Sequence, residues 1–400
     1  MSLPTLDDLG DAAGSRVLVR ADLNVPLDAG RVADDFRIRA TLPTLRELLE
    51  RGAAVVAASH LGRPKGAVRE ELRMRPVAAR LGELLEREVG YHPAGGCLDD
   101  EVRARVGRLA PGEVFLLENL RFDPGEEAND EGFAAALAGL ADAYVDDAFG
   151  AVHRAHASVD ALPRRFRAEG RPAVAGRLLQ REVEVLGRLR EEPDRPYVAI
   201  LGGAKVSDKL ATIGALVERV DALLIGGAMA FTFLATEGAE VGRTLIEPER
   251  FDDVREARRR AGERGVLIEL PADAVAAPEA SGETRWRTVP AREIPRDLMA
   301  LDIGPRTVEE YARIVADART VLWNGPMGVF ELEPFSAGTR GLATAIAGAP
   351  AFSVAGGGDT LAAIARAGLA DAFDHLSTGG GASLEFLEGR DLPGIRALEA

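Results

Sequence analysis

The sequence stretch with the clearest chemical potential is a run of three glycines that precedes an acidic and a hydroxyl side chain. Residues 352–355 form a short apolar run typical of a β-strand, and a helical pattern covers residues 361–369. Between them stand Gly356, Gly357, Gly358, Asp359 and Thr360. A strand, a glycine turn and a helix start together present backbone N–H groups to an anion such as a phosphate. Asp359 offers a hard oxygen ligand for a phosphate-bound Mg²⁺, and we expect Thr360 to be the N-cap of the helix.

Basic and polar side chains recur where the predicted strands of the N-terminal half end. The group consists of Asp22, Asn24, Arg37, His60, Arg63, Arg121, His153 and Arg154. An arginine fork binds a carboxylate or a phosphate through two hydrogen bonds, so four arginines suit a small molecule that carries several negative charges. Any one of these arginines could be a solvated loop residue, but four of them at one sheet edge favour a binding site.

Strands and helices must alternate for these side chains to meet. Apolar runs predict four buried strands, over residues 17–26, 53–59, 114–117 and 143–145. Helical patterns lie between them, over residues 43–50, 74–88 and 131–140. This alternation predicts βαβ units and a parallel sheet, whose ligand crevice lies outside the carboxyl ends of the strands. We expect the first helix to open at Pro43 and Arg37 to lie on the loop before it.

The C-terminal half repeats the alternation, with strand ends that are rich in glycine instead of arginine. The predicted strands of this series cover residues 197–201, 222–225, 266–270, 299–303, 320–323, 352–355 and 374–376. Gly202 and Gly203 follow the first of these strands, and Lys205 and Lys209 come shortly after them. Backbone N–H groups and lysines suit a polyphosphate, which complements the small acid expected for the first half. Residues 281–292 are polar and irregular, and we expect an excursion of the second domain there.

Length, charge and cysteine content limit the class of protein. A chain of 400 residues exceeds the usual size of a single core, so two domains are expected. The net charge of −15 argues against general binding to nucleic acid or to an anionic membrane. The longest apolar run, residues 222–235, is shorter than the roughly 20 residues that a membrane-spanning helix needs. Cys97 is the only cysteine, which excludes a disulfide framework and fits the reducing cytoplasm.

Eight sequence blocks resemble the phosphoglycerate kinase family in their order and spacing. They are VLVRADLNVP, SHLGRPKG, LENLRF, DDAFGAVHRAHAS, ILGGAKVSDK, LWNGPMGVFE, AGGGDT and STGGGASLEFLEG. The resemblance covers essentially the whole chain, and it implies two doubly wound parallel-sheet α/β domains that face each other across a cleft and are joined by a helix. We place the phosphoglycerate domain at 1–172, the connecting helix at 173–192, the nucleotide domain at 193–383, and a C-terminal segment that returns to the first domain at 384–400.

The resemblance also implies a reaction and the residues that bind its ligands. The reaction is the reversible, Mg²⁺-dependent transfer of a phosphoryl group between 1,3-bisphosphoglycerate and ADP, which gives 3-phosphoglycerate and ATP in glycolysis. By matching motif, the phosphoglycerate would be held by Asp22, Leu23, Asn24, Arg37, His60, Leu61, Gly62, Arg63, Arg121 and Arg154. ATP or ADP would be held by Lys205, Lys209, Asn324, Glu331, Gly356, Gly357, Gly358, Asp359 and Thr360, with the metal on Asp359. The family precedent further implies a monomer.

The resemblance assigns catalysis to residues that neutralise charge. They are Arg37, Lys205, Gly379 and Gly380, which would act on the transferred phosphoryl group. The two nucleophiles of this reaction, a carboxylate and a phosphate, are already anionic at neutral pH, so no general base is needed. Positioning and charge neutralisation then carry the reaction.

Other functions remain as alternatives. Another two-domain, ATP-dependent acid kinase would need a different spacing of the arginines. A nucleotide-binding protein that has lost catalysis would be expected to lack Arg37, Lys205 or Asp359, all of which are present. A P-loop ATPase is disfavoured because the GGAKVSDK block lacks the four-residue gap of that motif, and a nicotinamide dehydrogenase lacks its glycine fingerprint after the first strand. His153 and His156 lie three residues apart, but no glutamate or cysteine completes a zinc pattern.

Overall fold

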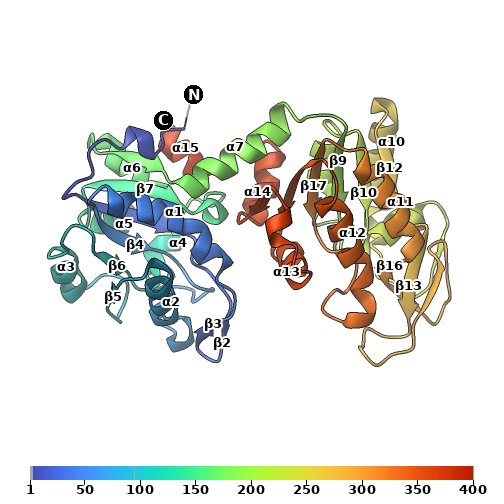
Figure 1. The fold of residues 1–400 in the computed structure, drawn as a ribbon, viewed down its shortest axis with the longest axis horizontal. Helices are drawn as coiled ribbons and strands as arrows, with labels where there is room; N and C mark the ends of the chain where they lie inside the picture. Colours follow the sequence, from blue (N-terminus) through green and yellow to red (C-terminus); the bar gives the residue numbers. More distant parts are fainter. Residues whose placement is uncertain (1–2, 94, 400) are drawn as a thin grey trace. The chain divides into compact units, whose positions relative to one another are not determined.

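The computed structural model describes residues 3–93 and 95–399, which form two compact units (Figure 1). Unit 1 is formed by Met1–Glu184 together with Asp391–Ala400, and unit 2 by Val185–Arg390. Helix α7 (Arg177–Glu191) contributes residues to both units. The C-terminal helix α15 (Pro393–Glu399) belongs to unit 1, where it packs against helix α6 and strand β8.

A six-stranded sheet in which all neighbouring strands are parallel forms the centre of unit 1. Its order is β5 (Val89–Tyr91), β6 (Val114–Leu116), β4 (Ala54–Ala58), β1 (Arg16–Ala21), β7 (Ala143–Asp147) and β8 (Ala173–Ala175). The chain first builds one side of the sheet, from β1 through β4, β5 and β6, and then continues on the other side with β7. The carboxyl ends of β1 and β7 therefore flank the position at which doubly wound sheets bind their ligands.

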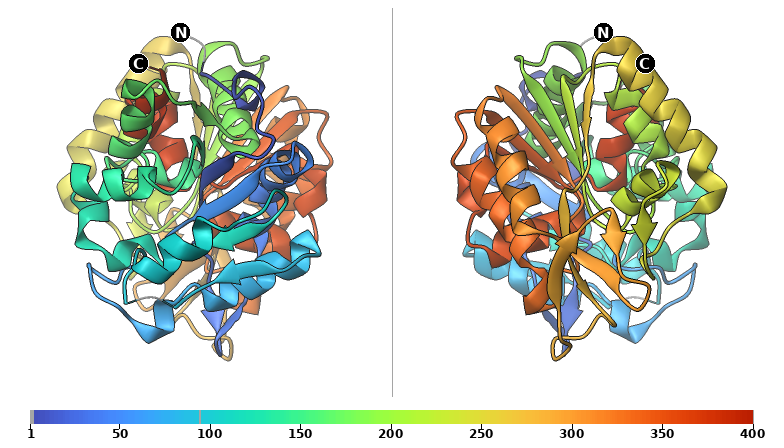
Figure 2. Two further views of the ribbon diagram at one scale, coloured as in Figure 1. Left: turned by 90° about the vertical axis from the view of Figure 1, so that its left-hand side faces the viewer. Right: turned by 90° about the vertical axis from the view of Figure 1, so that its right-hand side faces the viewer.

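Helices cover both faces of this sheet, as the left view of Figure 2 shows. The helices of unit 1 are α1 (Phe36–Glu50), α2 (Arg75–Leu85), α3 (Asp100–Val106), α4 (Pro124–Glu127), α5 (Glu131–Ala138), α6 (Ala161–Ala168) and α15. Short 3₁₀ turns lie at Leu6–Asp8, Glu70–Leu72, Leu120–Phe122 and Phe149–Ala151, and β2 (Leu27–Asp28) pairs with β3 (Arg31–Val32). Two of these turns directly follow β6 and β7, so they hold side chains at the edge of the sheet where a ligand is expected.

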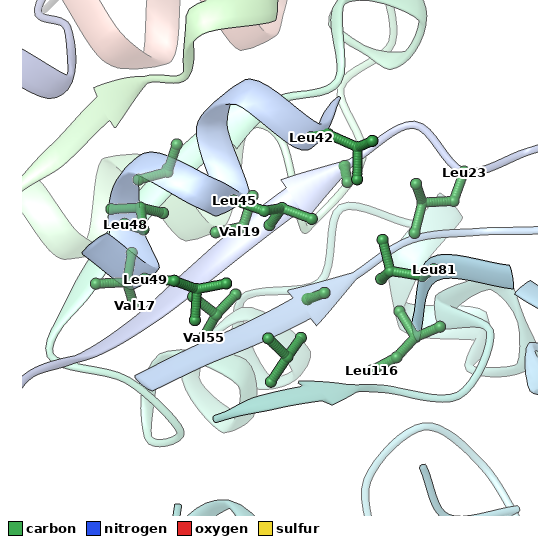
Figure 3. Packing of buried hydrophobic residues seen from close by; sticks show 14 of the residues in the cluster. Val17, Val19, Leu23, Leu42, Leu45, Leu48, Leu49, Val55, Leu81 and Leu116 are labelled. Atoms are coloured by element: carbon green, nitrogen blue, oxygen red, sulfur yellow. The ribbon is translucent and has the colours of Figure 1, made fainter. Parts of the chain in front are cut away.

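Helix α1 packs on the sheet through a leucine face (Figure 3). Leu42, Leu45 and Leu49 are buried in one cluster with Val17 of β1 and Val55 of β4, and Leu49 lies nearest to these two valines. Burial of such side chains contributes roughly 1.5–3 kcal/mol each. The apolar face begins at Ile38, before Pro43, and its burial outweighs the one hydrogen bond that the proline cannot make. The prediction that the helix opens at Pro43 is therefore wrong, and so is the loop position expected for Arg37, which lies in the first turn of α1.

Unit 2 contains a second six-stranded parallel sheet. Its order is β12 (Leu267–Glu269), β10 (Ala222–Ile225), β9 (Tyr197–Leu201), β17 (Thr320–Asn324), β18 (Phe352–Gly356) and β19 (His375–Ser377). The strand order reverses between β9 and β17, which makes their carboxyl ends the expected ligand position of this unit. Two doubly wound α/β sheets confirm the predicted fold class.

Helices also lie on both sides of the second sheet, as the right view of Figure 2 shows. They are α8 (Leu210–Leu216), α9 (Met229–Thr236), α10 (Phe251–Arg264), α11 (Pro305–Ala316), α12 (Ala337–Ala347), α13 (Gly358–Arg366) and α14 (Gly381–Leu387). Short 3₁₀ turns lie at Pro248–Arg250, Glu333–Phe335 and Ala370–Ala372. The apolar run 222–235 forms β10 and α9, as expected for a buried strand and helix. None of the helices in the described ranges has the length and apolar character needed to cross a bilayer.

A smaller antiparallel sheet corrects one sequence prediction. The strand β16 (Met299–Ile303) was expected to continue the parallel series, but it pairs antiparallel with β13 (Asp273–Ala277). On its other side β13 pairs with β14 (Arg287–Pro290), which lies inside the segment predicted to be irregular. An apolar run does not specify its partner strand, and here Ala274, Ala276 and Ala300 bury one face of this sheet in a separate small core. A short parallel pair, β11 (Glu240–Val241) with β15 (Glu293–Ile294), adjoins it.

Candidate functional site

Asp22 and Arg37 form an ion pair at the carboxyl end of β1. The strand ends at Ala21, so Asp22 begins the following loop, where its side chain is only 2% exposed. Arg37 Nη1 donates a hydrogen bond of 2.8 Å to Asp22 Oδ2. A guanidinium group has five N–H donors, so this bond leaves Arg37 further donors for an anionic ligand.

The loop after β4 is tied to two other strand ends through Gly62. Asn24 Oδ1 accepts a hydrogen bond of 2.9 Å from the Gly62 N–H, and Arg121 Nη1 donates one of 2.9 Å to the Gly62 carbonyl oxygen. Gly62 has a φ of +62°, and a Cβ atom at this position would lie 2.7 Å from Leu72. The positive φ therefore favours glycine where the loops after β1, β4 and β6 meet, and a larger residue would also displace the Leu72 side chain.

The leucines of the predicted site contribute backbone and not side chains. Leu23 and Leu61 are buried, in keeping with a role in the core. The Leu23 N–H donates to Ser59 Oγ at 2.9 Å, and the Leu61 N–H donates to Asn119 Oδ1 at 3.2 Å. Asn119 also donates from Nδ2 to the Leu61 carbonyl oxygen at 2.7 Å. These bonds fix the backbone that carries Asn24, His60 and Gly62.

His60 is a neutral, buried histidine within a group of cations. Its side chain is 5% exposed, and its Nδ1 lies 3.1 Å from Arg20 Nη2. Burial lowers the pKa of His60 well below its usual value, and the charges of Arg20, Arg121 and Arg37 lower it further. His60 therefore meets a ligand as a neutral ring at physiological pH.

Positive potential extends to the loop after β7. Burial and the charges of Arg121, Arg20 and Arg154 lower the pKa of His156 to about 4. Arg154 itself is exposed, and its Nε lies 3.3 Å from His153 Nε2. Concentrated positive charge at one sheet edge suits a small polyanion.

The structure joins most of the predicted phosphoglycerate residues but not all of them. Hydrogen bonds or ion pairs link the loops that carry Asp22, Leu23, Asn24, Arg37, His60, Leu61, Gly62 and Arg121. Arg63 is exposed on the same loop as Gly62 and makes no hydrogen bond or ion pair with another described residue. Arg154 contacts its neighbour His153 rather than this group. Both are exposed cations beside the linked loops.

In unit 2 the carboxyl ends of β9 and β17 approach each other so closely that both require glycine. A Cβ atom on Gly325, whose φ is +101°, would lie 2.2 Å from the Gly202 carbonyl oxygen. A Cβ atom on Gly202 would lie 2.1 Å from the Pro326 carbonyl oxygen. Two bare backbone segments thus meet at the point where the strand order of the sheet reverses.

Asn324 connects the glycine-rich turn to Lys209. Its Nδ2 donates a hydrogen bond of 2.9 Å to the Gly356 carbonyl oxygen, and its Oδ1 accepts one from Lys209 Nζ. Lys209 precedes the first residue of α8 and is partly buried, which lowers the pKa of its ammonium group. An ammonium group that has lost hydration interacts strongly with a phosphate that reaches it.

The predicted N-cap role of Thr360 is wrong. Helix α13 begins at Gly358, its N-cap is Gly357 with a φ of +94°, and Thr360 lies inside the first turn. Thr360 is fully buried, and its Oγ1 accepts a hydrogen bond of 2.7 Å from the Gly325 N–H. The hydroxyl group therefore fastens the helix to the end of β17, and the exposed Asp359 lies beside it in the first turn.

A cavity of about 360 Å³ opens beside these residues. Its lining includes Ala204, Gly227, Leu245, Met299, Glu331 and Asp359. The walls are mainly apolar, and of the three carboxylates that line the cavity Glu331 and Asp359 are exposed while Asp302 is buried. An apolar pocket with a few polar groups is typical of a site for a small organic ligand.

The loop between β9 and α8 is held by a buried acid. Glu247 accepts hydrogen bonds from the Ser207 N–H at 2.9 Å and from Ser207 Oγ at 2.6 Å. Lys205 lies two residues earlier on this loop and is exposed. Burial acts to raise the pKa of Glu247, but the hydrogen bonds from Ser207 and, to a smaller extent, the charge of Lys205 outweigh it and lower the pKa.

The two glycines before α14 differ in their contacts. The Gly379 N–H donates to Ser377 Oγ at 3.2 Å, so this donor already has a partner within the loop. Gly380 has a φ of +55° and occupies the N-cap position of α14. Helix α14 thus begins directly after these glycines, while the N–H group of Gly379 would have to exchange partners in order to bind a ligand.

Sequence reasoning missed three residues that support the site, namely Arg20, Asn119 and Glu247. Arg20 stands inside a buried strand, where a charge needs compensating partners, and this signal could have identified it. Asn119 belongs to a polar strand end and could have been found with Arg121. Glu247 lies in a loop without a recognisable pattern, and its role depends on a chain segment 40 residues away.

Comparisons with known proteins agree along the whole chain. A sequence model of the family "Phosphoglycerate kinase" matches residues 6–390. The phosphoglycerate kinase of Salinispora tropica is 56% identical over 409 residues and that of Thermomicrobium roseum 55% over 383 residues, covering 100% and 96% of both chains, respectively. The solved phosphoglycerate kinase of Coxiella burnetii superposes with a TM-score of 0.86 at 39% identity, and the alignment covers 99% of each chain. That of Pyrococcus horikoshii has a TM-score of 0.86 at 35% identity, with 99% of this chain and 98% of the other covered. The chain belongs to the phosphoglycerate kinase family.

Proposed function

We propose that this chain catalyses the reversible transfer of a phosphoryl group between 1,3-bisphosphoglycerate and ADP, giving 3-phosphoglycerate and ATP in glycolysis. The observation that carries the proposal is the set of linked loops in unit 1, where Asp22, Arg37 and Arg121 meet at the carboxyl ends of β1, β4 and β6. Such a cluster fits a ligand with a carboxylate and a phosphate group. Membership of the family along the whole chain supports the reaction assigned to it.

In this proposal unit 1 binds the phosphoglycerate. The cations of Arg37, Arg63, Arg121 and Arg154 neutralise its charges, and the neutral His60 donates a hydrogen bond to it. Asp22 and Asn24 accept hydrogen bonds from its hydroxyl group and hold the loops at the same time. Support comes from the bonds that already join Asp22 to Arg37 and Asn24 to Gly62.

The nucleotide binds to unit 2 in this proposal. The cavity of about 360 Å³ takes the base, and Glu331 at its lining binds the ribose. Gly356, Gly357 and Gly358 offer the backbone to the phosphates, with Lys209 and Asn324 beside them. Thr360 acts through its bond to the Gly325 N–H, which places the start of α13 next to the end of β17.

Mg²⁺ fits the donors of this site when it is carried by the nucleotide. Among the described residues no group of three or more histidines, cysteines or acids could form a protein cage for a metal ion. Mg²⁺ in kinases is commonly held by one or two carboxylates together with substrate phosphates, and the exposed Asp359 in the first turn of α13 supplies one. When bound, the ion neutralises phosphate charge during the transfer.

The protein contributes charge stabilisation and position to the chemistry. The carboxylate of 3-phosphoglycerate attacks the terminal phosphorus of ATP, the new acyl phosphate bond forms, and the bond to ADP breaks. No proton has to be removed from the nucleophile. Arg37 and Lys205 stabilise the negative charge on the transferred group, and the N–H groups near Gly379 and Gly380 contribute at its far side.

Loss of catalysis is the alternative function, and it is not favoured. A protein that only binds nucleotides would have no need for the linked acid-binding loops of unit 1. Arg37, Lys205 and Asp359 are all present. Relatives that are more than half identical to this chain are phosphoglycerate kinases.

We further propose that the enzyme acts in the cytoplasm as a monomer. A single cysteine, Cys97, is buried and unpaired, which suits a reducing compartment. The large apolar side chains that are exposed in the described ranges are Val68, Leu245, Leu267 and Trp286; Leu267 lies on β12 and the other three lie in three different loops. Separate apolar residues do not build the continuous patch that a stable dimer needs.

The proposed function is tested by ATP consumption with purified protein, 3-phosphoglycerate and Mg²⁺. Each component is omitted in turn. Consumption that requires both the acid and the metal ion supports the proposal. Consumption of ATP without the acid, or nucleotide binding without any turnover, would contradict it.

A further inference from the structure

Arg20 is a charged residue that is completely buried in the sheet of unit 1. It lies on β1 and is 0% exposed, although it belongs to no direct arginine–carboxylate pair among the described residues. Its Nε donates to Ser158 Oγ at 2.8 Å, its Nη1 donates to the Ala21 carbonyl oxygen at 2.5 Å, and its Nη2 lies 3.1 Å from His60 Nδ1. Because the three partners lie in three different directions, the planar guanidinium group is held in a single orientation.

A relay of hydrogen bonds balances the buried charge of Arg20. Ser158 accepts from Arg20 and donates in turn from Oγ to Glu126 Oε1 at 2.6 Å. The Ser158 N–H donates to Glu126 Oε2 at 3.0 Å, so the carboxylate is held on both oxygens. Glu126 thus fixes the position of Ser158 Oγ. Arg20 cannot turn away from His60 without losing the hydrogen bond to this hydroxyl oxygen.

The chemistry of the guanidinium group determines the state of His60. Every polar hydrogen-bonding atom of arginine is a donor, so a ring nitrogen that faces it must accept. Nδ1 of His60 therefore carries no hydrogen, and the ring hydrogen lies on Nε2. Since Nδ1 is occupied, Nε2 is the nitrogen that remains for a ligand.

We propose that Arg20 is a positioning residue that fixes His60 as the Nε2–H tautomer, so that His60 presents a hydrogen-bond donor to the anionic substrate. The proposal rests on the proposed function only for the identity of that substrate. The opposite tautomer would direct a lone pair at a carboxylate or phosphate oxygen and repel it. Arg20 therefore acts through His60 and does not itself touch the substrate.

The charges around His60 support a ring that stays neutral. Cations face it from β1 (Arg20), from the turn after β6 (Arg121) and from α1 (Arg37), and His156 faces it from the loop after β7. The carboxylate of Asp22 is paired with Arg37 and so does not offset the other cations. Burial and these charges lower the pKa of His60 well below its usual value. The donor on Nε2 should then be present at all pH values at which the protein is folded and active.

The tautomer can be measured in the ligand-free protein by ¹H–¹⁵N correlation spectroscopy of labelled histidine side chains. The spectrum of a His60→Gln variant assigns the signals of His60. We expect the Nε2–H pattern without movement between pH 5.5 and 8. An Nδ1–H pattern, or titration of His60 within this range, would overturn the proposal whether or not the protein is an active kinase.

Two substitutions of Arg20 separate a positioning role from a merely structural one. Lysine can only donate, so Arg20→Lys should keep the tautomer. Glutamine can donate and accept, so Arg20→Gln should permit the Nδ1–H form and let His60 become protonated at low pH. The quantity to measure is the KM of Arg20→Gln for 3-phosphoglycerate divided by the KM of the unsubstituted enzyme. We expect this ratio to rise by roughly threefold or more from pH 6 to pH 8.

Titration of the substrate changes KM equally for both enzymes, so its effect cancels in the ratio of the two KM values. The same ratio for Arg20→Lys should stay flat, and the kcat ratios of both variants should change little with pH. Flat KM ratios for both variants would overturn the proposal. If Arg20→Gln does not fold, the spectrum of the unsubstituted protein still decides.

Discussion

Arg37 Nη1 and Asp22 Oδ2 lie 2.8 Å apart and join the first turn of α1 to the carboxyl end of β1. The carboxylate is buried and the arginine is about one-third exposed, so Asp22 orients Arg37 at the surface of the site. A hydrogen bond between charged groups contributes roughly 1.5–3 kcal/mol. The pair therefore explains why an acid stands inside a cluster that we propose to bind an acid.

The substitution Asp22→Asn tests this orienting role. The amide can still accept a hydrogen bond but no longer carries charge, so kcat/KM for 3-phosphoglycerate should fall by about tenfold or more. Steady-state kinetics measure the change, with Asp28→Asn on the exposed strand β2 as a control that should resemble the unsubstituted enzyme. Equal kcat/KM values for Asp22→Asn and the control would contradict the role of the pair.

Thr360 makes a buried hydrogen bond that can be removed without changing the shape of the side chain. In Thr360→Val the Gly325 N–H loses its acceptor, and an unsatisfied buried donor costs about 1–3 kcal/mol. Urea unfolding should show this loss, while Thr360→Ser retains the hydroxyl group and most of the stability. Equal stabilities of the valine and serine variants would show that the bond contributes nothing.

Asp302 should make the stability of the protein depend on pH. Burial raises the pKa of this carboxyl to about 7, although the Gly338 and Ile303 N–H groups donate to it. The folded state then binds more protons than the unfolded state between about pH 4 and pH 7. The free energy of unfolding should therefore fall as pH rises through this window, by up to ~1.4 kcal/mol per pH unit for one group.

Removal of the titrating group should flatten this part of the pH dependence. We expect Asp302→Asn to be less stable at pH 5, since the amide NH₂ group cannot accept a hydrogen bond from either of the two N–H donors, but its stability should vary less between pH 5 and pH 7. Urea unfolding at several pH values measures both slopes, and the exposed Asp297→Asn serves as the control. Parallel curves for Asp302→Asn and the control would refute the assignment of this slope to Asp302.

The alternation of apolar runs predicted both parallel sheets because buried parallel strands read as continuous apolar segments. Because parallel strands have their carboxyl ends at the same edge of a sheet, Asp22, His60 and Arg121, which follow three of these strands, could be assigned to one edge. The partner of a strand could not be predicted in this way. Met299–Ile303 has the same pattern as the other strands, but a neighbouring hairpin rather than the central sheet supplies its partner.

At two helix starts a local sequence signal indicated a different first residue from the one in the structure. Pro43 suggested a start that the leucine face of α1 overrides, and Thr360 suggested a cap in a turn that begins two residues earlier at Gly358. A charged residue inside an apolar strand could have marked Arg20 as a residue with buried partners, but the local pattern could not identify those partners. Its three partners lie on the same strand, on the loop after β4 and 138 residues away at Ser158, and only the folded chain brings them together.

Lys209 should act on the nucleotide and not on the acid. Its ammonium group is partly desolvated beside Asn324, so a phosphate gains more from it than from an exposed lysine. Lys209→Met should raise KM for ATP by about tenfold or more and leave KM for 3-phosphoglycerate within a few-fold. The second KM is the internal control, and equal changes in both constants would contradict a role confined to the nucleotide half of the site.

The central claim, that the linked loops of unit 1 carry phosphoryl transfer, is tested most directly by kcat for ATP formation from 1,3-bisphosphoglycerate and ADP. The measurement compares the unsubstituted enzyme with Arg37→Ala and with the control Arg39→Ala. Arg39 is an exposed arginine of the same helix, and its side chain pairs with Asp35. We predict a loss of roughly 10³-fold or more for Arg37→Ala, as for other arginines that stabilise phosphoryl transfer, and a near-normal kcat for Arg39→Ala. A kcat for Arg37→Ala within a few-fold of the unsubstituted enzyme would contradict the account.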